Sequence, residues 1–194
     1  MREAWFAWLL EQASRIHEPM VRARKRALFA ELKGDVLEIG PGNGVNLQYL
    51  TDAVQWTGYE PNRCLAKKIV VPSGGRLFVE EFSKQDGVYD AVISSLVLCS
   101  VREPAAVLRA LHGSLRSGGR FFFMEHVGAQ PGTALRRAQE RWLPVWRFCA
   151  GGCHPNRDTG ELIEAAGFEI QSLERFDLPL GLAGPHIMGV GIKR

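Results

Sequence analysis

The chain is poor in cysteine. Its 194 residues include only Cys64, Cys99, Cys149 and Cys153, and no two of them form a Cys-x-x-Cys pair. A disulfide-held scaffold and a zinc ribbon both need more cysteines at closer spacings. Cys149, Cys153 and His154 lie close enough in sequence to suggest a metal, but no second ligand pair accompanies them, so no metal site is expected. So few cysteines favour a reducing, cytoplasmic location.

Long apolar runs and a large excess of charge of one sign are also missing. The longest early apolar run covers residues 4–10, whereas a membrane span needs roughly 20 residues. Charged residues follow that run, which argues against a signal peptide. Lys and Arg number 24 against 21 acidic residues, and such a balance gives no support for nucleic-acid binding. The composition predicts one soluble domain over residues 1–194, with N-terminal helices in 1–34 and a core in 35–194.

The first 34 residues have a helical pattern. Trp5, Trp8, Leu9 and Gln12 fall on one face, and a break is expected between Glu18 and Pro19 because proline disfavours helix in the residue before it. We expect a lid or packing helix whose polar face is basic. The alternative is weak contact with a membrane surface through the tryptophans of this helix.

The rest of the chain alternates short apolar runs with helical patterns. The predicted strands cover residues 35–39, 55–59, 76–80, 89–94, 119–124, 168–174 and 186–192. The predicted helices cover residues 104–116, 133–146 and 158–166. For the second helix, the alternative is an early end at Pro144. Several strands are near-continuously apolar, as strands buried on both faces require. This alternation predicts an α/β fold with an open, mostly parallel, doubly wound sheet.

A glycine-rich turn follows the first predicted strand. Gly40, Gly42 and Gly44 give the pattern GxGxG, whereas a dinucleotide fingerprint, GxGxxG, would place its third glycine at Val45. Glu38 precedes the first glycine, and its carboxylate would repel a pyrophosphate but suits a cationic ligand. No Lys-Ser or Lys-Thr pair follows, which excludes a Walker loop. We expect a helix to start after this turn.

Glu60 follows the second predicted strand, twenty residues after Gly40. An acidic residue at this distance from a glycine loop accepts hydrogen bonds from the vicinal hydroxyls of a ribose. A ribose joined to a positive group without phosphates describes S-adenosylmethionine. The alternative for Glu60 is an ordinary carboxylate at the end of a strand.

Three sequence segments in the second half of the chain, together with the glycine loop, indicate a protein family. They are Leu96-Val97-Leu98-Cys99-Ser100-Val101, Phe123-Met124-Glu125-His126-Val127 and Gly184-Pro185-His186-Ile187-Met188-Gly189. In these segments the sequence resembles the class I S-adenosylmethionine-dependent methyltransferases. Within them it is most similar to the methyltransferase-like family 7 thiol methyltransferases of animal cells and their bacterial relatives. The matching stretches are spread over nearly the whole chain from residue 36 onward.

This resemblance implies a Rossmann-like, doubly wound sheet of seven strands, mostly parallel with an antiparallel last strand. It also implies S-adenosyl-L-methionine as the cofactor. The residues that it assigns to the cofactor follow the first four strands: Glu38, Gly40, Gly42, Gly44, Asn46, Glu60, Pro61, Glu81, Phe82, Ser95 and Leu96.

The same topology places the acceptor site. An antiparallel last strand starts at the edge where the strand 119–124 ends, so we expect His126 and His186 to gather there. A neutral histidine at that place can take the proton of an acceptor thiol. The alternative for each histidine is a structural residue bonded to its neighbours. Cys99 also lies near this edge, and its expected role is that of a small buried hydrophobe.

Methyl transfer to a small molecule, most simply a thiol, is therefore the predicted activity. One alternative is a phenol, quinone or lipid acceptor. Another is a catalytically silent module that binds S-adenosylmethionine, because cofactor binding and acceptor chemistry are separable. A nucleotide-binding oxidoreductase is disfavoured by the missing third glycine and by Glu38.

Overall fold

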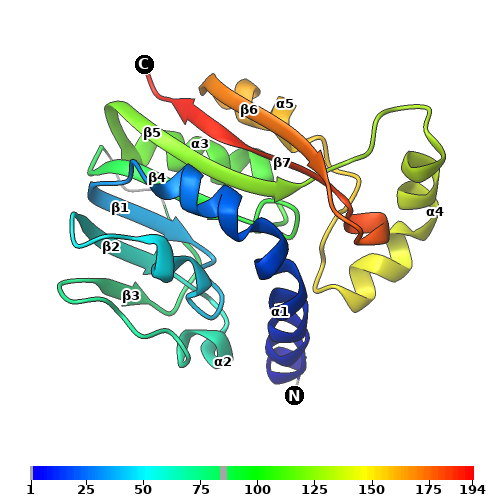
Figure 1. Cartoon of the computed structure of the whole chain (residues 1–194), viewed down its shortest axis with the longest axis horizontal. Helices are drawn as coiled ribbons and strands as arrows, with labels where there is room; N and C mark the ends of the chain where they lie inside the picture. The colour runs from blue at the N-terminus through cyan, green and yellow to red at the C-terminus, as the bar shows by residue number, and fades with distance from the viewer. Residues whose placement is uncertain (1, 84–86) are drawn as a thin grey trace.

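A computed structural model describes residues 2–83 and 87–194, and its centre is a seven-stranded sheet (Figure 1). The strands are β1 (Gly34–Ile39), β2 (Val54–Tyr59), β3 (Arg76–Phe78), β4 (Tyr89–Ser95), β5 (Leu115–His126), β6 (Glu169–Asp177) and β7 (Pro185–Ile192). Their order is β3-β2-β1-β4-β5-β7-β6. Strands β1 to β5 run parallel, and β7 is antiparallel to both β5 and β6. The predicted fold class and all seven predicted strands are confirmed.

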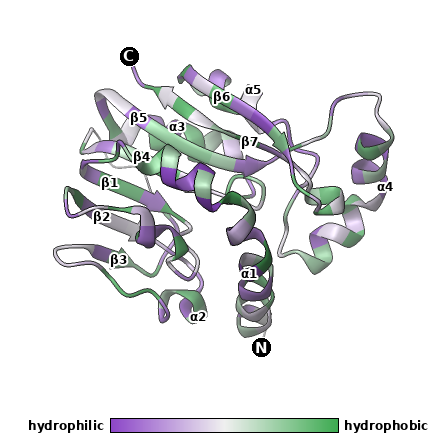
Figure 2. Cartoon of the chain, in the orientation of Figure 1, coloured by the Kyte–Doolittle hydropathy of each residue, from purple (hydrophilic) through white to green (hydrophobic). Residues whose placement is uncertain are grey.

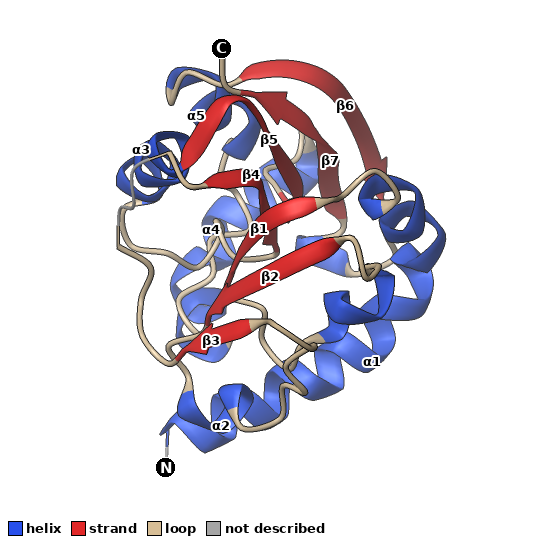
Figure 3. Cartoon of the chain, turned by 90° about the vertical axis from the view of Figure 1, so that its left-hand side faces the viewer, coloured by secondary structure: helices blue, strands red, loops and turns tan. Residues whose placement is uncertain are grey.

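The helices connect and cover these strands. They are α1 (Arg2–Phe29), α2 (Arg63–Ala66), α3 (Pro104–Ser114), α4 (Ala134–Cys149) and α5 (Thr159–Ala165), with the short 3-10 helices η1 (Val45–Tyr49) and η2 (Gly181–Ala183). Figure 3 shows α1 on one side of the sheet and α3 and α5 on the other.

The continuous apolar runs supply a core on each side of the sheet. Phe121 and Phe123 pack in the cluster that includes α3 and α5, whereas Phe122 packs in the cluster that includes the C-terminal part of α1. Successive side chains of a strand point to opposite faces, so a strand covered on both faces must be apolar at every position. Figure 2 shows hydrophobic residues along the central strands, most plainly on β5.

The predicted break in the N-terminal helix is wrong. Helix α1 is continuous through Pro19 and changes direction partway along its length (Figure 1). A proline inside a helix removes one hydrogen bond and bends the axis, but buried contacts can hold both halves. Here Glu18 forms a buried ion pair with Lys25 at 2.7 Å and accepts a hydrogen bond from Tyr49 of η1. These contacts fix α1 beside the loop that follows β1.

Three other boundaries differ from the prediction. Helix α4 continues through Pro144 to Cys149. The helix predicted over residues 104–116 ends at Ser114, and the next residue, Leu115, already starts β5. The glycine turn leads into the 3-10 helix η1 and not into an α-helix, since the side chain of Asn46 is drawn inward to Glu38.

Candidate functional site

The carboxyl ends of the parallel strands form one edge of the sheet, where ligands of open α/β folds bind. The glycine turn follows β1, Glu60 follows β2, Leu96 follows β4 and His126 ends β5. The antiparallel β7 starts at the same edge, and its register pairs His186 directly with His126. Most of the predicted site residues therefore lie along one edge.

Glu60 and the glycine turn are joined by hydrogen bonds. The backbone N–H of Gly42 donates to Oε2 of Glu60 at 2.8 Å, and the N–H of Asn62 donates to Oε1 at 2.8 Å. The carboxyl is 5% exposed, and burial raises its pKa against the effect of these two bonds. Gly42 has φ +62, a left-handed conformation that glycine adopts without strain. The turn and the carboxylate are thus held as one unit.

This unit fits a ribose and a cationic group. A carboxylate has about four acceptor positions, and two on Glu60 are used, which leaves room for two hydroxyls. Above Gly42, the ideal Cβ position meets only the side chain of Leu10 among the described residues, at 3.5 Å. Oδ1 of Asn46 is buried and receives no hydrogen bond from residues 2–83 or 87–194, and an ammonium group would supply a donor. These are features that S-adenosylmethionine requires.

Glu38 lies beneath the turn. It is 1% exposed and accepts hydrogen bonds from Asn46 at 2.7 Å and from the indole of Trp56 at 2.8 Å. Burial raises its pKa, although both hydrogen bonds act in the opposite direction. Glu38 therefore fixes the orientation of Asn46, whose free oxygen faces away from that bond. Trp56 is a partner that the sequence analysis missed.

The other predicted cofactor residues near Glu60 are less well assembled. Tyr59 stacks on Phe78 with ring centroids 4.7 Å apart and meets Phe82 edge-on at 5.1 Å. Phe82 is thus part of an aromatic group near Glu60. Glu81 and Pro61 are both exposed, and Gly44 caps the start of η1.

The segment after β4 is strained. Leu96 is the only non-glycine residue with positive φ in the described parts of the chain, at +59. Its N–H donates to the carbonyl of Met124 at 2.8 Å. Side chains held in this region cost about 1–3 kcal/mol and cluster at functional sites. Ser95 lies next to it and is half-buried.

Glu125 supports the turn after β4 from below. It accepts hydrogen bonds from Ser94 at 2.7 Å and from the N–H of Val97 at 3.2 Å, while its other oxygen is buried without a partner. Burial, together with the nearby Cys99 thiol, raises its pKa to about 8. Glu125 is therefore largely protonated at neutral pH.

His186 is saturated by its neighbours. Its Nδ1 lies 2.7 Å from the carbonyl of Gly184, so Nδ1 carries the hydrogen. Its Nε2 lies 3.1 Å from Nε2 of His17 on α1 and accepts that hydrogen bond. Burial lowers the pKa of His186 to about 4 and that of His17 to about 3. This geometry favours the structural alternative for His186, and His17 is a partner that no local pattern indicated.

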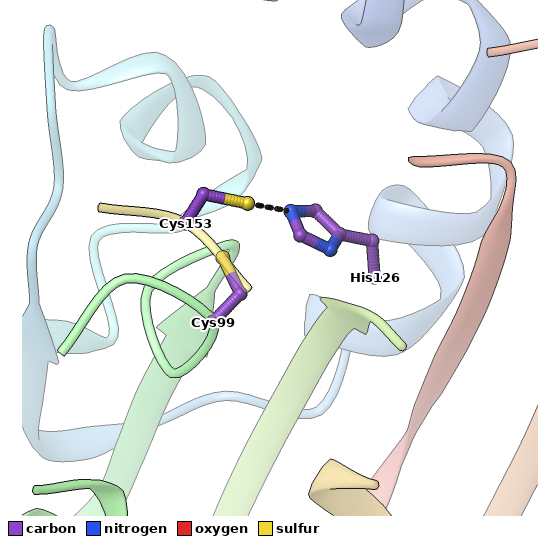
Figure 4. A group of neighbouring side chains, drawn as sticks. All are labelled: Cys99, His126 and Cys153. Atoms are coloured by element: carbon purple, nitrogen blue, oxygen red, sulfur yellow. Dashed lines mark hydrogen bonds between the residues drawn. The ribbon is translucent and has the colours of Figure 1, made fainter. Parts of the chain in front are cut away.

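The His126 side chain, in contrast, lies beside two cysteine sulfurs. Its Nε2 lies 3.2 Å from Sγ of Cys153, and the sulfur of Cys99 lies within 4.8 Å of both donor atoms. All three side chains are buried and point toward one another (Figure 4). The indole N–H of Trp146 also donates to Cys153, at 3.1 Å. The neighbouring Cys153 thiol and the His126 ring lower the pKa of Cys99 well below its usual value, despite burial.

Cys149, Cys153 and His154, which are close in sequence, do not come together as one group in the structure. Cys149 is exposed, and Nδ1 of His154 lies 3.3 Å from the carbonyl oxygen of Cys99. Only Cys153 joins His126.

A cleft of about 620 Å³ lies beside this group. It is formed by Trp5 and Phe6 of α1, by Phe148 of α4 and by the turn Gly151–Gly152. Gly152 directly precedes Cys153 in the chain, and Cys153 itself is buried. The cleft is therefore a candidate site for a small acceptor close to this group.

Comparison with known proteins adds an independent line of evidence. The family model described as a methyltransferase domain matches residues 11–173. The human thiol S-methyltransferase TMT1A is 31% identical over 210 residues, which cover 97% of this chain and 86% of that protein. The human thiol S-methyltransferase TMT1B is also 31% identical, over 98% of this chain and 87% of its own length.

Solved structures share the fold. A SAM-dependent methyltransferase from Thermotoga maritima superposes with a TM-score of 0.70 at 20% identity, covering 98% of both chains. The [4+2]-cyclase SpnF has the same TM-score of 0.70 at 16% identity, covering 88% of this chain and 80% of its own. Since one of these proteins is named as a cyclase, the fold alone does not define the reaction.

Proposed function

The chain belongs to the methyltransferase domain family and is an S-adenosylmethionine-dependent methyltransferase, and we propose that it methylates a small-molecule thiol. The observation that carries the thiol proposal is the match, over nearly the full chain, to proteins named thiol S-methyltransferases. The geometry of the sheet edge is consistent with the thiol proposal. The predicted cofactor residues after β1 and β2 lie at the same edge as the group of Cys99, His126 and Cys153.

The cofactor residues bind S-adenosylmethionine and orient it. When bound, S-adenosylmethionine supplies an electrophilic methyl group next to a positive sulfur. Glu60 has two free acceptor positions for ribose hydroxyls, and Asn46 offers its unpaired oxygen to an ammonium group. The glycine turn lets the backbone approach closely. Positioning of this kind can supply roughly 7–11 kcal/mol of the barrier.

The acceptor residues exclude water and handle a proton. A thiol reacts as the thiolate, and its ordinary pKa is near ~8.5. Of the two histidines predicted to assist, His186 has both ring nitrogens occupied, whereas Nδ1 of His126 has no hydrogen-bond partner in the part of the chain that the structure describes. Activation of the thiol is therefore assigned to the surroundings of His126.

The test is a screen for release of S-adenosylhomocysteine with small alkyl thiols, aryl thiols, phenols, quinones, amines and lipids. We expect turnover with alkyl thiols. Methylation of a phenol, quinone or lipid without methylation of any thiol would contradict the thiol acceptor and leave the methyltransferase assignment intact. Cofactor binding without turnover on any acceptor would indicate a silent module.

The N-terminal end of α1 supports a secondary proposal. Trp5 and Trp8 stack with ring centroids 5.1 Å apart and are 62% and 49% exposed. None of the described helices combines the length and apolarity needed to span a membrane. We propose a cytoplasmic protein that touches membrane surfaces weakly through these side chains. Co-sedimentation with lipid vesicles should fall when both tryptophans are replaced by alanine, and unchanged sedimentation would contradict the contact.

A further inference from the structure

We propose that Cys99, His126 and Cys153 bind one zinc ion whose fourth ligand is the sulfur of the acceptor thiol. This inference rests on the proposed thiol methyltransferase function and specifies how the acceptor is activated. No sequence pattern predicts this site. The three residues come from the turn after β4, the end of β5 and the segment after α4, and His126 and Cys153 are 27 positions apart.

The distances suit a zinc ion. The three donor atoms all lie within 4.8 Å of one another, and the sulfur of Cys153 is 3.2 Å from Nε2 of His126. Ligand atoms about 2.0–2.3 Å from a tetrahedral zinc are about 3.3–3.8 Å from each other. Side-chain shifts that shorten the longest of these separations by up to about 1 Å would therefore centre an ion between the three donor atoms (Figure 4).

The loops that carry the cysteines are fastened to each other. The N–H of His154 donates to the carbonyl of Cys99 at 2.8 Å. The guanidinium of Arg157 donates to the carbonyl oxygens of Leu98 and of Val101, the latter at 3.1 Å. The two sulfurs are thus held in place without a disulfide, as a preorganised metal site requires.

Trp146 supplies the kind of partner that outer-shell residues give to metal ligands. Its indole N–H donates to the sulfur of Cys153 at 3.1 Å, so this sulfur already serves as a hydrogen-bond acceptor. Such partners orient ligand atoms and tune their basicity. Trp146 is therefore a positioning residue for the metal.

The number of ligands is typical of reactive zinc. Structural sites use four protein ligands, whereas catalytic sites use three and leave one position for substrate. The acceptor thiol would take this fourth position. Gly152, which lines the cleft between α1 and α4, directly precedes the ligand Cys153 in the chain.

The chemistry balances without another reagent. A thiol that binds zinc releases its proton to solvent, because the metal holds sulfur as thiolate. The zinc-held sulfur forms its bond to the methyl carbon while the bond between that carbon and the sulfonium breaks. The products are a thioether and S-adenosylhomocysteine. The uncharged thioether is a weak ligand, and the next thiol replaces it.

The test uses cobalt as a coloured substitute for zinc. The full chain is freed of metal with a chelator under a phosphine reductant and then titrated with Co²⁺. We expect one equivalent to bind, with thiolate-to-cobalt charge-transfer bands and the intense visible bands of a tetrahedral ion, and Zn²⁺ to displace it. Adding 2-mercaptoethanol should change the visible bands, because a thiol enters the fourth position.

Variants assign the ligands. Cys99→Ser, Cys153→Ser and His126→Gln should each abolish the tetrahedral spectrum, whereas the matched controls Cys64→Ser and Cys149→Ser should retain it. Trp146→Phe should weaken binding about 10–100-fold. Circular dichroism of the metal-free variants against the metal-free wild type reports folding, and the wild-type titration stands without any variant.

Several results would overturn the proposal. These are the absence of charge-transfer bands in the wild type, their retention in the Cys99→Ser/Cys153→Ser double variant, or visible bands that 2-mercaptoethanol leaves unchanged. Full thiol methylation by the metal-free enzyme would also overturn it while leaving the proposed function intact. A thiol-sensitive cobalt site in a protein that methylates no thiol would instead contradict the proposed function.

Discussion

The two halves of the sheet edge are built differently. In the half beside β1 and β2, Glu38, Gly42, Asn46 and Glu60 lie within 23 consecutive residues and are joined by hydrogen bonds across one turn. In the half beside β4, β5 and β7, the interacting groups come from α1, three loops and two strand ends. The residues of the first half are close together in the sequence, whereas those of the second half are far apart in the sequence and are brought together only by folding.

Replacing Gly42 is the strongest test of the local half. In Gly42→Val, the side chain enters the space above the turn, where Leu10 is the only described residue within contact distance. We therefore expect no measurable binding of S-adenosylhomocysteine by calorimetry. The positive φ adds strain of about 1–3 kcal/mol.

Gly132→Val is the matched control, because Gly132 has φ +81 and no atom within 4 Å of its ideal Cβ position. It should lose comparable stability and keep its affinity. A Gly42→Val protein with normal circular dichroism and normal cofactor affinity would show that the turn is only structural.

Replacing His126 and replacing His186, which both lie in the half beside β4, β5 and β7, should affect the methylation rate very differently. His126→Gln should lower the rate with an alkyl thiol about 10²-fold, the usual effect of removing a group that activates a nucleophile. The loss should be smaller with an acidic aryl thiol, and part of the rate should return at high pH, where free thiolate is abundant. His186→Gln should keep most of the rate, because His186 is already saturated by Gly184 and His17.

Steady-state kinetics at limiting thiol measure both variants. Equal losses in the two variants would return His186 to the list of catalytic residues. Wild-type rates in both would make the histidines structural and leave alignment and desolvation as the source of catalysis.

The sequence predicted the sheet well because its signals are short in range. Apolar runs reveal buried strands, and a glycine turn before an acidic residue predicts a ribose site. The pattern also predicted the seventh strand, whereas its antiparallel direction came from the resemblance. The error at Pro19 has the opposite origin, because the ion pair of Glu18 with Lys25 and the contact with Tyr49 are tertiary. No spacing rule connects Cys99, His126 and Cys153, so this group became visible only in the fold.

Removing the Glu60 carboxylate should weaken cofactor binding by about 1.5–3 kcal/mol, or roughly 10–150-fold. Glu60→Ala loses both the ribose acceptor and the partner of the Gly42 N–H. Calorimetry with S-adenosylhomocysteine measures the effect.

Glu81→Ala is the companion variant, because Glu81 was assigned to the cofactor from sequence but is exposed. Its affinity should change about fivefold or less, as for other exposed charges. Unchanged affinity in Glu60→Ala would remove Glu60 from the site.

The contact between α1 and β7 is tested through stability instead of binding or rate, because it makes stability depend on pH. The pKa values of His17 and His186 are lowered from 6.5 to about 3 and about 4, by burial first. Lys25 and His126 lower the pKa of His17 further. Both rings are therefore neutral in the folded protein, while the unfolded chain binds protons below about pH 6.5.

Stability is consequently complete above pH 6.5 and falls as the pH drops toward 4, by about 1–2 kcal/mol per histidine at pH 5. Urea unfolding at pH 7, 6 and 5 measures this slope. The double variant His17→Gln/His186→Gln should flatten it, since glutamine keeps a hydrogen-bonding group and does not titrate. A wild-type free energy of unfolding that stays constant from pH 7 to pH 5 would mean that the two rings accept protons in the folded state. In that case His186 would be available as a base after all, and the difference between the two histidines would disappear.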